Sequence, residues 1–164
     1  MQNKKTAKTK SPKLIQSSLG LFSEMDREVF SSAHDEIMCW TNAHAQEIIG
    51  RLWPENKNWK ITSKRWERPV TTTVKREEGL IGFIDLAVTT TARPERVYFE
   101  IKTQIRPGSD IRQINAYKFY QTPQQDWDED LSGPFVVVSP DDRHAELLAD
   151  QGIRFVKYPE FLSA

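Results

Sequence analysis

The apolar positions between residues 34 and 52 recur every three to four residues, the period of an α-helix with one buried face. Pro54 is expected to end this helix, because proline cannot supply the next backbone hydrogen bond. Another helix is predicted before this one in the chain, beginning at Ser23, which can act as its N-cap. The expected inner stripes are Phe22, Met25, Val29 and Phe30 in the helix from Ser23, and Ile37, Trp40, Ile48 and Leu52 in the helix at residues 34–52.

After residue 58 the pattern changes to alternation and to β-branched runs, which predict strands. The predicted strands are residues 59–74, 79–91, 97–103, 135–139 and 153–158. Two further helices are predicted at 110–120, from a Ser or Asp cap, and at 140–151, ending at Gly152. The polar residues 121–130 are expected to form a loop. The order ααβββαβαβ indicates an α/β sandwich with a central mixed sheet.

A chain of 164 residues with 38% hydrophobic and 28% charged residues suits one globular domain, predicted over residues 19–164. Residues 1–18 are expected to be a disordered basic tail. The formal net charge is +0, so the five tail lysines leave the rest of the chain negative by the same five charges. Such a tail either screens repulsion from a polyanion such as DNA or simply aids solubility. Its lysines are Lys4, Lys5, Lys8, Lys10 and Lys13.

Cys39 is the only cysteine, which excludes an intrachain disulfide framework and suits a reducing cytoplasm. No apolar run approaches the ~18 residues of a membrane span. The basic N-terminus also lacks the apolar stretch of a secretory signal. We therefore expect a cytoplasmic protein with no membrane partner.

Three charged residues interrupt the predicted core strands. Glu100 and Lys102 are two positions apart and so project from the same face, while Asp85 breaks an apolar run in the preceding strand. Burying an unpaired ion costs several kcal/mol, so these groups need one another or a ligand. One lysine cannot neutralise two carboxylates, and the excess negative charge favours a hard cation such as Mg²⁺. A solvated ion pair in the strand is the alternative.

The segments GLIGFIDLAV, RVYFEIKTQ and SDIRQINAYKFY together resemble the PD-(D/E)XK, or restriction-endonuclease-like, nuclease superfamily. The resemblance spans about residues 34–161 and is nearest to phage- and plasmid-borne members. It implies that Asp85, Glu100 and the Ile101 carbonyl hold Mg²⁺, for which Mn²⁺ can substitute, and that Lys102 assists catalysis. Gln113 and Tyr117 match the Q-x-x-x-Y pattern of RecB-like members, which implies that they position the substrate near the lysine.

The family usually adds a glutamate from the first core helix. Glu36 and Glu47 are eleven residues apart and share a helical face, so either is a candidate, and we favour Glu36. Glu67 is a candidate outer member of the site. The proline of the family motif is replaced by Ile84. A separate histidine metal site is not favoured by the spacing of the three histidines, and His34 is interpreted as a helix-start residue or a neighbour of Glu36.

Two further groups of residues, the strand aromatics and a basic run, each allow two interpretations. The strand aromatics, among them Trp66 and Tyr98, suit core packing better than base stacking. A basic run in and before the first strand suits either phosphate contacts or a solvated strand face. The run is Lys57, Lys60, Lys64, Arg65 and Arg68, and near the Q-x-x-x-Y motif Arg112 and Lys118 are further candidates.

The sequence contains no phosphate-binding G-x-x-x-x-G-K-[ST] loop, no G-x-G-x-x-G and no G-x-S-x-G, so nothing supports nucleotide hydrolysis, dinucleotide binding or serine hydrolase chemistry. The favoured function is a Mg²⁺-dependent DNA nuclease. Because one site cuts one strand at a time, a homodimer is a further expectation. The alternative is a catalytically silent nucleic-acid-binding or assembly module on the same fold.

Overall fold

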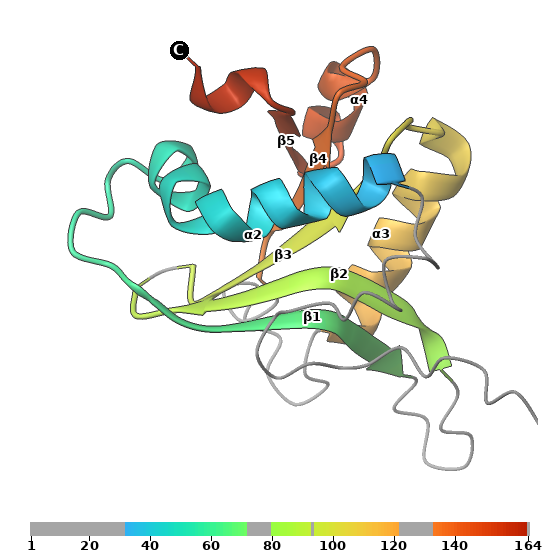
Figure 1. Ribbon diagram of the computed structural model, residues 1–164. Helices are drawn as coiled ribbons and strands as arrows, with labels where there is room; N and C mark the ends of the chain where they lie inside the picture. Colours follow the sequence, from blue (N-terminus) through green and yellow to red (C-terminus); the bar gives the residue numbers. More distant parts are fainter. Residues whose placement is uncertain (1–31, 72–79, 93, 122–132, 164) are drawn as a thin grey trace, which may run out of the picture.

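The computed structural model describes residues 32–71, 80–92, 94–121 and 133–163. Its centre is a five-stranded mixed sheet in the order β1-β2-β3-β4-β5 (Figure 1). Strand β2 pairs antiparallel with both β1 and β3, and β4 pairs parallel with both β3 and β5. The strands are β1 (Ile61–Thr71), β2 (Leu80–Thr90), β3 (Arg96–Ile101), β4 (Phe135–Ser139) and β5 (Arg154–Lys157).

The helices are α2 (Ser32–Leu52), α3 (Pro107–Gln121) and α4 (Ala145–Asp150), and a short 3-10 helix follows at Glu160–Leu162. The predicted α/β class and central mixed sheet are therefore confirmed. The tail, the helix predicted from Ser23 and nearly all of the loop predicted at 121–130 lie outside the described residues. None of the described helices has the length and apolar character needed to cross a bilayer.

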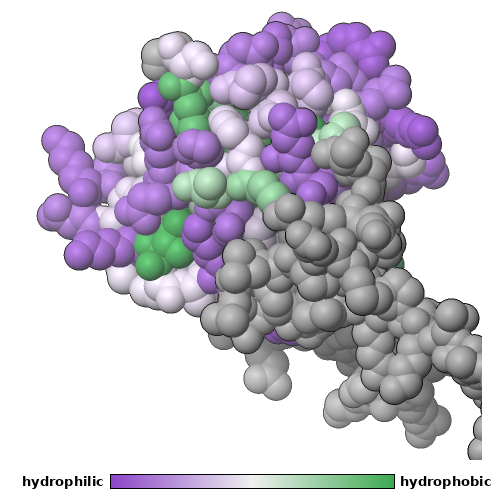
Figure 2. All heavy atoms as spheres, in the orientation of Figure 1, coloured by the Kyte–Doolittle hydropathy of each residue, from purple (hydrophilic) through white to green (hydrophobic). Residues whose placement is uncertain are grey.

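The sheet separates two apolar clusters. On one face α2 packs through buried Ile37, Ile48 and Ile49, which recur at helical spacing, against alternate residues of β3 and β4. On the other face α3 and α4 contribute Ile114 and Leu148 to a second cluster. Figure 1 shows α2 crossing the sheet with α3 on the opposite side. Hydrophilic side chains predominate on the face drawn in Figure 2, where apolar side chains form only small separate areas.

Two helix boundaries differ from prediction. Helix α3 begins at Pro107 rather than Asp110, because proline suits the first helical position, where no N–H is needed. The helix predicted at 140–151 is reduced to α4. Before it, the Asp141 carboxylate accepts the Ile105 N–H at 3.0 Å and the Arg143 guanidinium at 2.8 Å, which holds this segment in a turn. Gly152 follows α4 with φ +71°, as expected of a helix stop.

Strand β2 changes faces at Asp85. Leu86 packs in the α2-side cluster, whereas Ile84 packs in the α3-side cluster. Residues two apart share a face in a regular strand, so the backbone must turn between them. The same change occurs in β1 between Trp66 and Val70.

In β1 the change of face lies at Glu67, whose φ of +47° is in the left-handed region. A non-glycine residue pays about 1–2 kcal/mol there. Glu67 stands between the register pairs Trp66–Leu86 and Arg68–Ile84, and so opposite Asp85. The change of face in both strands is therefore centred on the Glu67–Asp85 position.

Candidate active site

The ladder between β2 and β3 ends at the pair Leu86–Phe99. Beyond this pair, the side chain of Asp85 serves as the acceptor in place of a backbone carbonyl of β2. Its Oδ2 accepts the Ile101 N–H at 2.7 Å. The N–H and C=O of one strand residue point to the same side of the strand. The Ile101 carbonyl is therefore directed toward β2 as well, on the side of Asp85.

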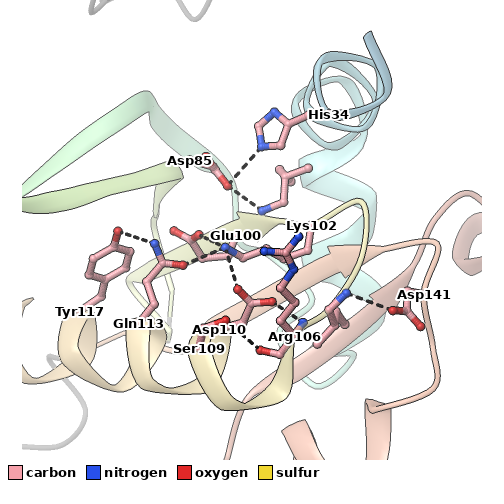
Figure 3. A network of polar contacts seen from close by, with 12 residues as sticks. His34, Asp85, Glu100, Lys102, Arg106, Ser109, Asp110, Gln113, Tyr117 and Asp141 are labelled. Carbon is pink, nitrogen blue, oxygen red and sulfur yellow. Dashed lines mark hydrogen bonds and ion pairs between the residues drawn. The ribbon is translucent and has the colours of Figure 1, made fainter. Parts of the chain in front are cut away.

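A pocket of about 380 Å³ opens where the two strands separate. Its walls come from the start of α2, from β2, from the end of β3 and from the first turns of α3, as Figure 3 shows. The charged and amide side chains predicted as site residues converge here from three different elements. They are Asp85, Glu100, Lys102 and Gln113, with the backbone of Ile101 beside them.

Glu100 is the most deeply buried of these groups, with 2% of its surface exposed. Burial, and next the negative charge of Asp85, raise the pKa of this carboxyl well above its usual 4.5, although the Lys102 charge acts in the opposite direction. Its Oε2 lies 3.8 Å from Lys102 Nζ. Its Oε1 is buried and has no hydrogen-bond partner among the described residues. One oxygen of a pocket carboxylate is thus left without a partner.

The Lys102 ammonium is fixed by three groups. It donates a 2.8 Å hydrogen bond to Gln113 Oε1 and lies 3.5 Å from Asp110 Oδ1, in addition to its contact with Glu100. These partners match the three donors of an ammonium group. Glu100 and Lys102 face α3, as the strand alternation predicts, while Phe99 packs in the α2-side cluster.

Tyr117 acts on this lysine through Gln113. Gln113 Nε2 donates to the Tyr117 hydroxyl at 3.0 Å, which leaves Gln113 Oε1 turned toward Lys102. Tyr117 is only 2% exposed and is not among the residues that line the pocket. Burial, and then the charge of Glu100, raise its pKa, so the hydroxyl stays protonated. The structure thus places Tyr117 behind Gln113, with Gln113 between its hydroxyl and Lys102.

The first helix presents His34 rather than Glu36 to the pocket. His34 Nε2 lies 3.8 Å from Asp85 Oδ2, whereas the Glu36 carboxylate accepts a 3.0 Å hydrogen bond from Tyr158 and does not line the pocket. Residues two apart on a helix lie about 200° apart, so the two side chains cannot share a side. In this structure the Glu36 carboxylate therefore lies outside the pocket, and its part in the site stays a prediction. Glu47 pairs with Arg51 at 3.0 Å on the helix surface and does not line the pocket either.

The sequence interpretation missed Asp110. It lies three residues before Gln113, one helical turn away on the same side of α3, and this spacing was the available signal.

Of the predicted aromatic and basic candidates, Trp66 and Tyr98 are buried in the core. Lys64 donates to the Asn42 carbonyl at 2.6 Å on α2, away from the pocket.

The oxygen donors of the pocket suit a hard divalent cation. Among the residues that the structure describes, no three His, Cys, Asp or Glu side chains form a ready-made ligand cluster. Mg²⁺, however, is commonly held by one or two carboxylates, with water and substrate phosphate completing its coordination. Asp85, the unpartnered Oε1 of Glu100 and the Ile101 carbonyl fit that requirement.

Comparison of the chain with protein-family models, with curated proteins and with solved structures gives no match. The function is therefore inferred from the pocket residues and the strand order.

Replacing Glu100 by glutamine should raise the melting temperature in EDTA, because it removes a charge whose burial is unfavourable. The raised pKa means that this cost is absent below about pH 4.5, where the carboxyl is neutral folded or unfolded, and grows as pH rises. The gain should therefore be near zero at pH 4 and largest at neutral pH. Exposed Glu95→Gln is the control, and a Glu100→Gln protein less stable than the parent at pH 7 would contradict this prediction.

Gly82 on β2 leaves room for Tyr117. A Cβ at this position would overlap the Tyr117 hydroxyl and stand 3.0 Å from its Cζ. Gly82→Ala should destabilise the protein by about 1–3 kcal/mol in urea unfolding, and by less in a Tyr117→Phe background. Gly108→Ala, whose Cβ meets nothing within 4 Å, is the control and should not lower stability. Equal effects in the two backgrounds would show that Gly82 does not seat the hydroxyl.

Proposed function

We propose that the protein is a Mg²⁺-dependent DNA nuclease of the PD-(D/E)XK superfamily that hydrolyses phosphodiester bonds. The observation that carries the proposal is the pocket between β2 and β3, where Asp85, Glu100 and Lys102 meet around a buried carboxylate oxygen that has no partner. The element order supports the proposal, since a helix, an antiparallel three-stranded meander, a second helix and a parallel fourth strand are what the resemblance implies.

Asp85, Glu100 and the Ile101 carbonyl would hold Mg²⁺, or Mn²⁺ in its place. When bound, such a cation polarises the phosphodiester and lowers the pKa of a bound water to make a nucleophile. The Ile101 N–H fixes the Asp85 carboxylate through its Oδ2, and His34 stands 3.8 Å from the same oxygen. Both contacts hold the carboxylate toward the pocket.

Lys102 supplies the positive charge that hydrolysis needs. A water oxygen bonds to phosphorus as the water gives up a proton to solvent, and one P–O bond breaks, after which the leaving oxygen takes up a proton from solvent. Negative charge therefore develops on the phosphate oxygens in between. A preorganised ammonium stabilises that charge without reorganising first. Gln113, itself held by Tyr117, keeps the ammonium in the pocket at 2.8 Å.

A binding module without chemistry would explain the pocket less well. Such a module needs positive charge to meet phosphate, yet here two carboxylates, those of Glu100 and Asp110, lie beside the Lys102 ammonium, and Glu100 is buried at a cost in stability. DNA is the proposed partner. The described residues form one such pocket, so cutting of both strands would require two copies of the chain.

Lys102→Ala should reduce cleavage of a supercoiled plasmid in Mg²⁺ by at least about 100-fold while the protein stays folded by circular dichroism. Lys64→Ala is the matched control, because Lys64, like Lys102, is partly buried but contacts α2 instead of the pocket. It should cut like the parent. A Lys102→Ala protein that cuts at the parental rate would refute the proposed role of this lysine, and a parent that never cuts would favour the silent module.

A further inference from the structure

The pocket wall carries a second strong cation that the proposed chemistry leaves unused. Apart from His34, the cationic residues lining the pocket are Lys102 and Arg106. Lys102 is held by three partners. The Arg106 guanidinium forms no hydrogen bond or ion pair with any residue that the structure describes, and only the backbone of Arg106 makes hydrogen bonds to them.

The backbone of Arg106 is nevertheless firmly placed. Its N–H donates to Asp110 Oδ2 at 2.6 Å, and its carbonyl accepts the Asp110 N–H at 2.8 Å and the Ser109 hydroxyl at 3.4 Å. Pro107 then begins α3. Figure 3 shows the side chain extending from this point toward Glu100 and Lys102. A fixed Cα thus presents an exposed guanidinium to the pocket.

Asp110 explains why this cation is not neutralised nearby. One carboxylate oxygen accepts the Arg106 backbone N–H and the other faces Lys102 at 3.5 Å, so both oxygens of Asp110, the acid nearest to Arg106 in the sequence, are already engaged. A guanidinium offers a planar fork of N–H donors that matches two phosphate oxygens. An anion entering the pocket would therefore meet a preformed, unoccupied fork beside the ammonium of Lys102.

We infer that Arg106 binds a phosphodiester of the nucleic-acid strand that enters the pocket and so is a substrate-binding residue. This inference rests on the proposed function and adds a named phosphate contact to it. Arg112 provides a matched comparison, because it also lies in the first turns of α3 and is exposed. Its Nε donates to the Gly108 carbonyl at 2.6 Å, and it does not line the pocket.

The test is fluorescence anisotropy of a labelled single-stranded DNA 20-mer in EDTA, where no cleavage occurs, over a series of salt concentrations. Arg106→Ala should weaken binding about tenfold near 0.1 M salt and lower the slope of log K against log salt by about 0.7, the value for one lost contact to a single strand. Arg106→Lys should fall between the parent and Arg106→Ala, because it keeps the charge and loses the fork. Arg112→Ala, which removes a cation outside the pocket, should weaken binding clearly less than Arg106→Ala.

Equal effects of Arg106→Ala and Arg112→Ala, or an unchanged salt slope in Arg106→Ala, would overturn the inference, as would a parent that does not bind the oligonucleotide. Because binding is read without Mg²⁺, it is independent of catalysis. A parent that binds through Arg106 but does not cut in Mg²⁺ would refute the nuclease and leave this contact standing. If the parent cuts DNA in Mg²⁺ but Arg106→Ala binds the oligonucleotide as tightly as the parent, the nuclease proposal stands and this contact is refuted.

Discussion

The structure depends on a buried carboxylate that its own surroundings do not fully satisfy. Glu100 lies at the end of a core strand, 2% exposed, with one oxygen near an ammonium and the other without a partner in the described part of the chain. Burial of a polar group in this state costs free energy, and the raised pKa of Glu100 reflects that cost. Surrounding groups are arranged to tolerate the carboxylate rather than to neutralise it, which is the condition that a cation-binding pocket requires.

The backbone creates this environment by separating two strands. At Asp85 the ladder between β2 and β3 has ended, and a side chain takes the role of the missing backbone acceptor. On the neighbouring strand β1, the residue opposite Asp85 is Glu67, whose backbone is in the left-handed region. Both β1 and β2 change faces at this pair. Such local strain is commonly found at functional sites, where the surrounding fold maintains it. Here it lies directly beside the proposed ligand Asp85.

Much of this arrangement could be predicted from the sequence. Helical spacing located α2, alternation located the strands, and the two-residue spacing of Glu100 and Lys102 placed both on one face. The i, i+4 spacing of Gln113 and Tyr117 correctly placed them on one side of α3, but burial of Tyr117 depends on its packing against Gly82, a tertiary contact that spacing cannot reveal. That His34 and not Glu36 lines the pocket could not be predicted either, because it depends on how α2 is rotated about its axis over the sheet. Alternation also assumes a regular strand, which is why it could not foresee the change of face at Asp85.

The most direct measurement is anomalous scattering from crystals of the protein soaked in Mn²⁺, which marks the cation itself. We expect one strong peak between Asp85 and Glu100, within coordination distance of both carboxylates and of the Ile101 carbonyl, and none in crystals of an Asp85→Asn variant treated identically. A peak elsewhere, or a pocket that still holds Lys102 against Glu100 with no peak at saturating Mn²⁺, would contradict the assignment of this pocket as a metal-dependent active site.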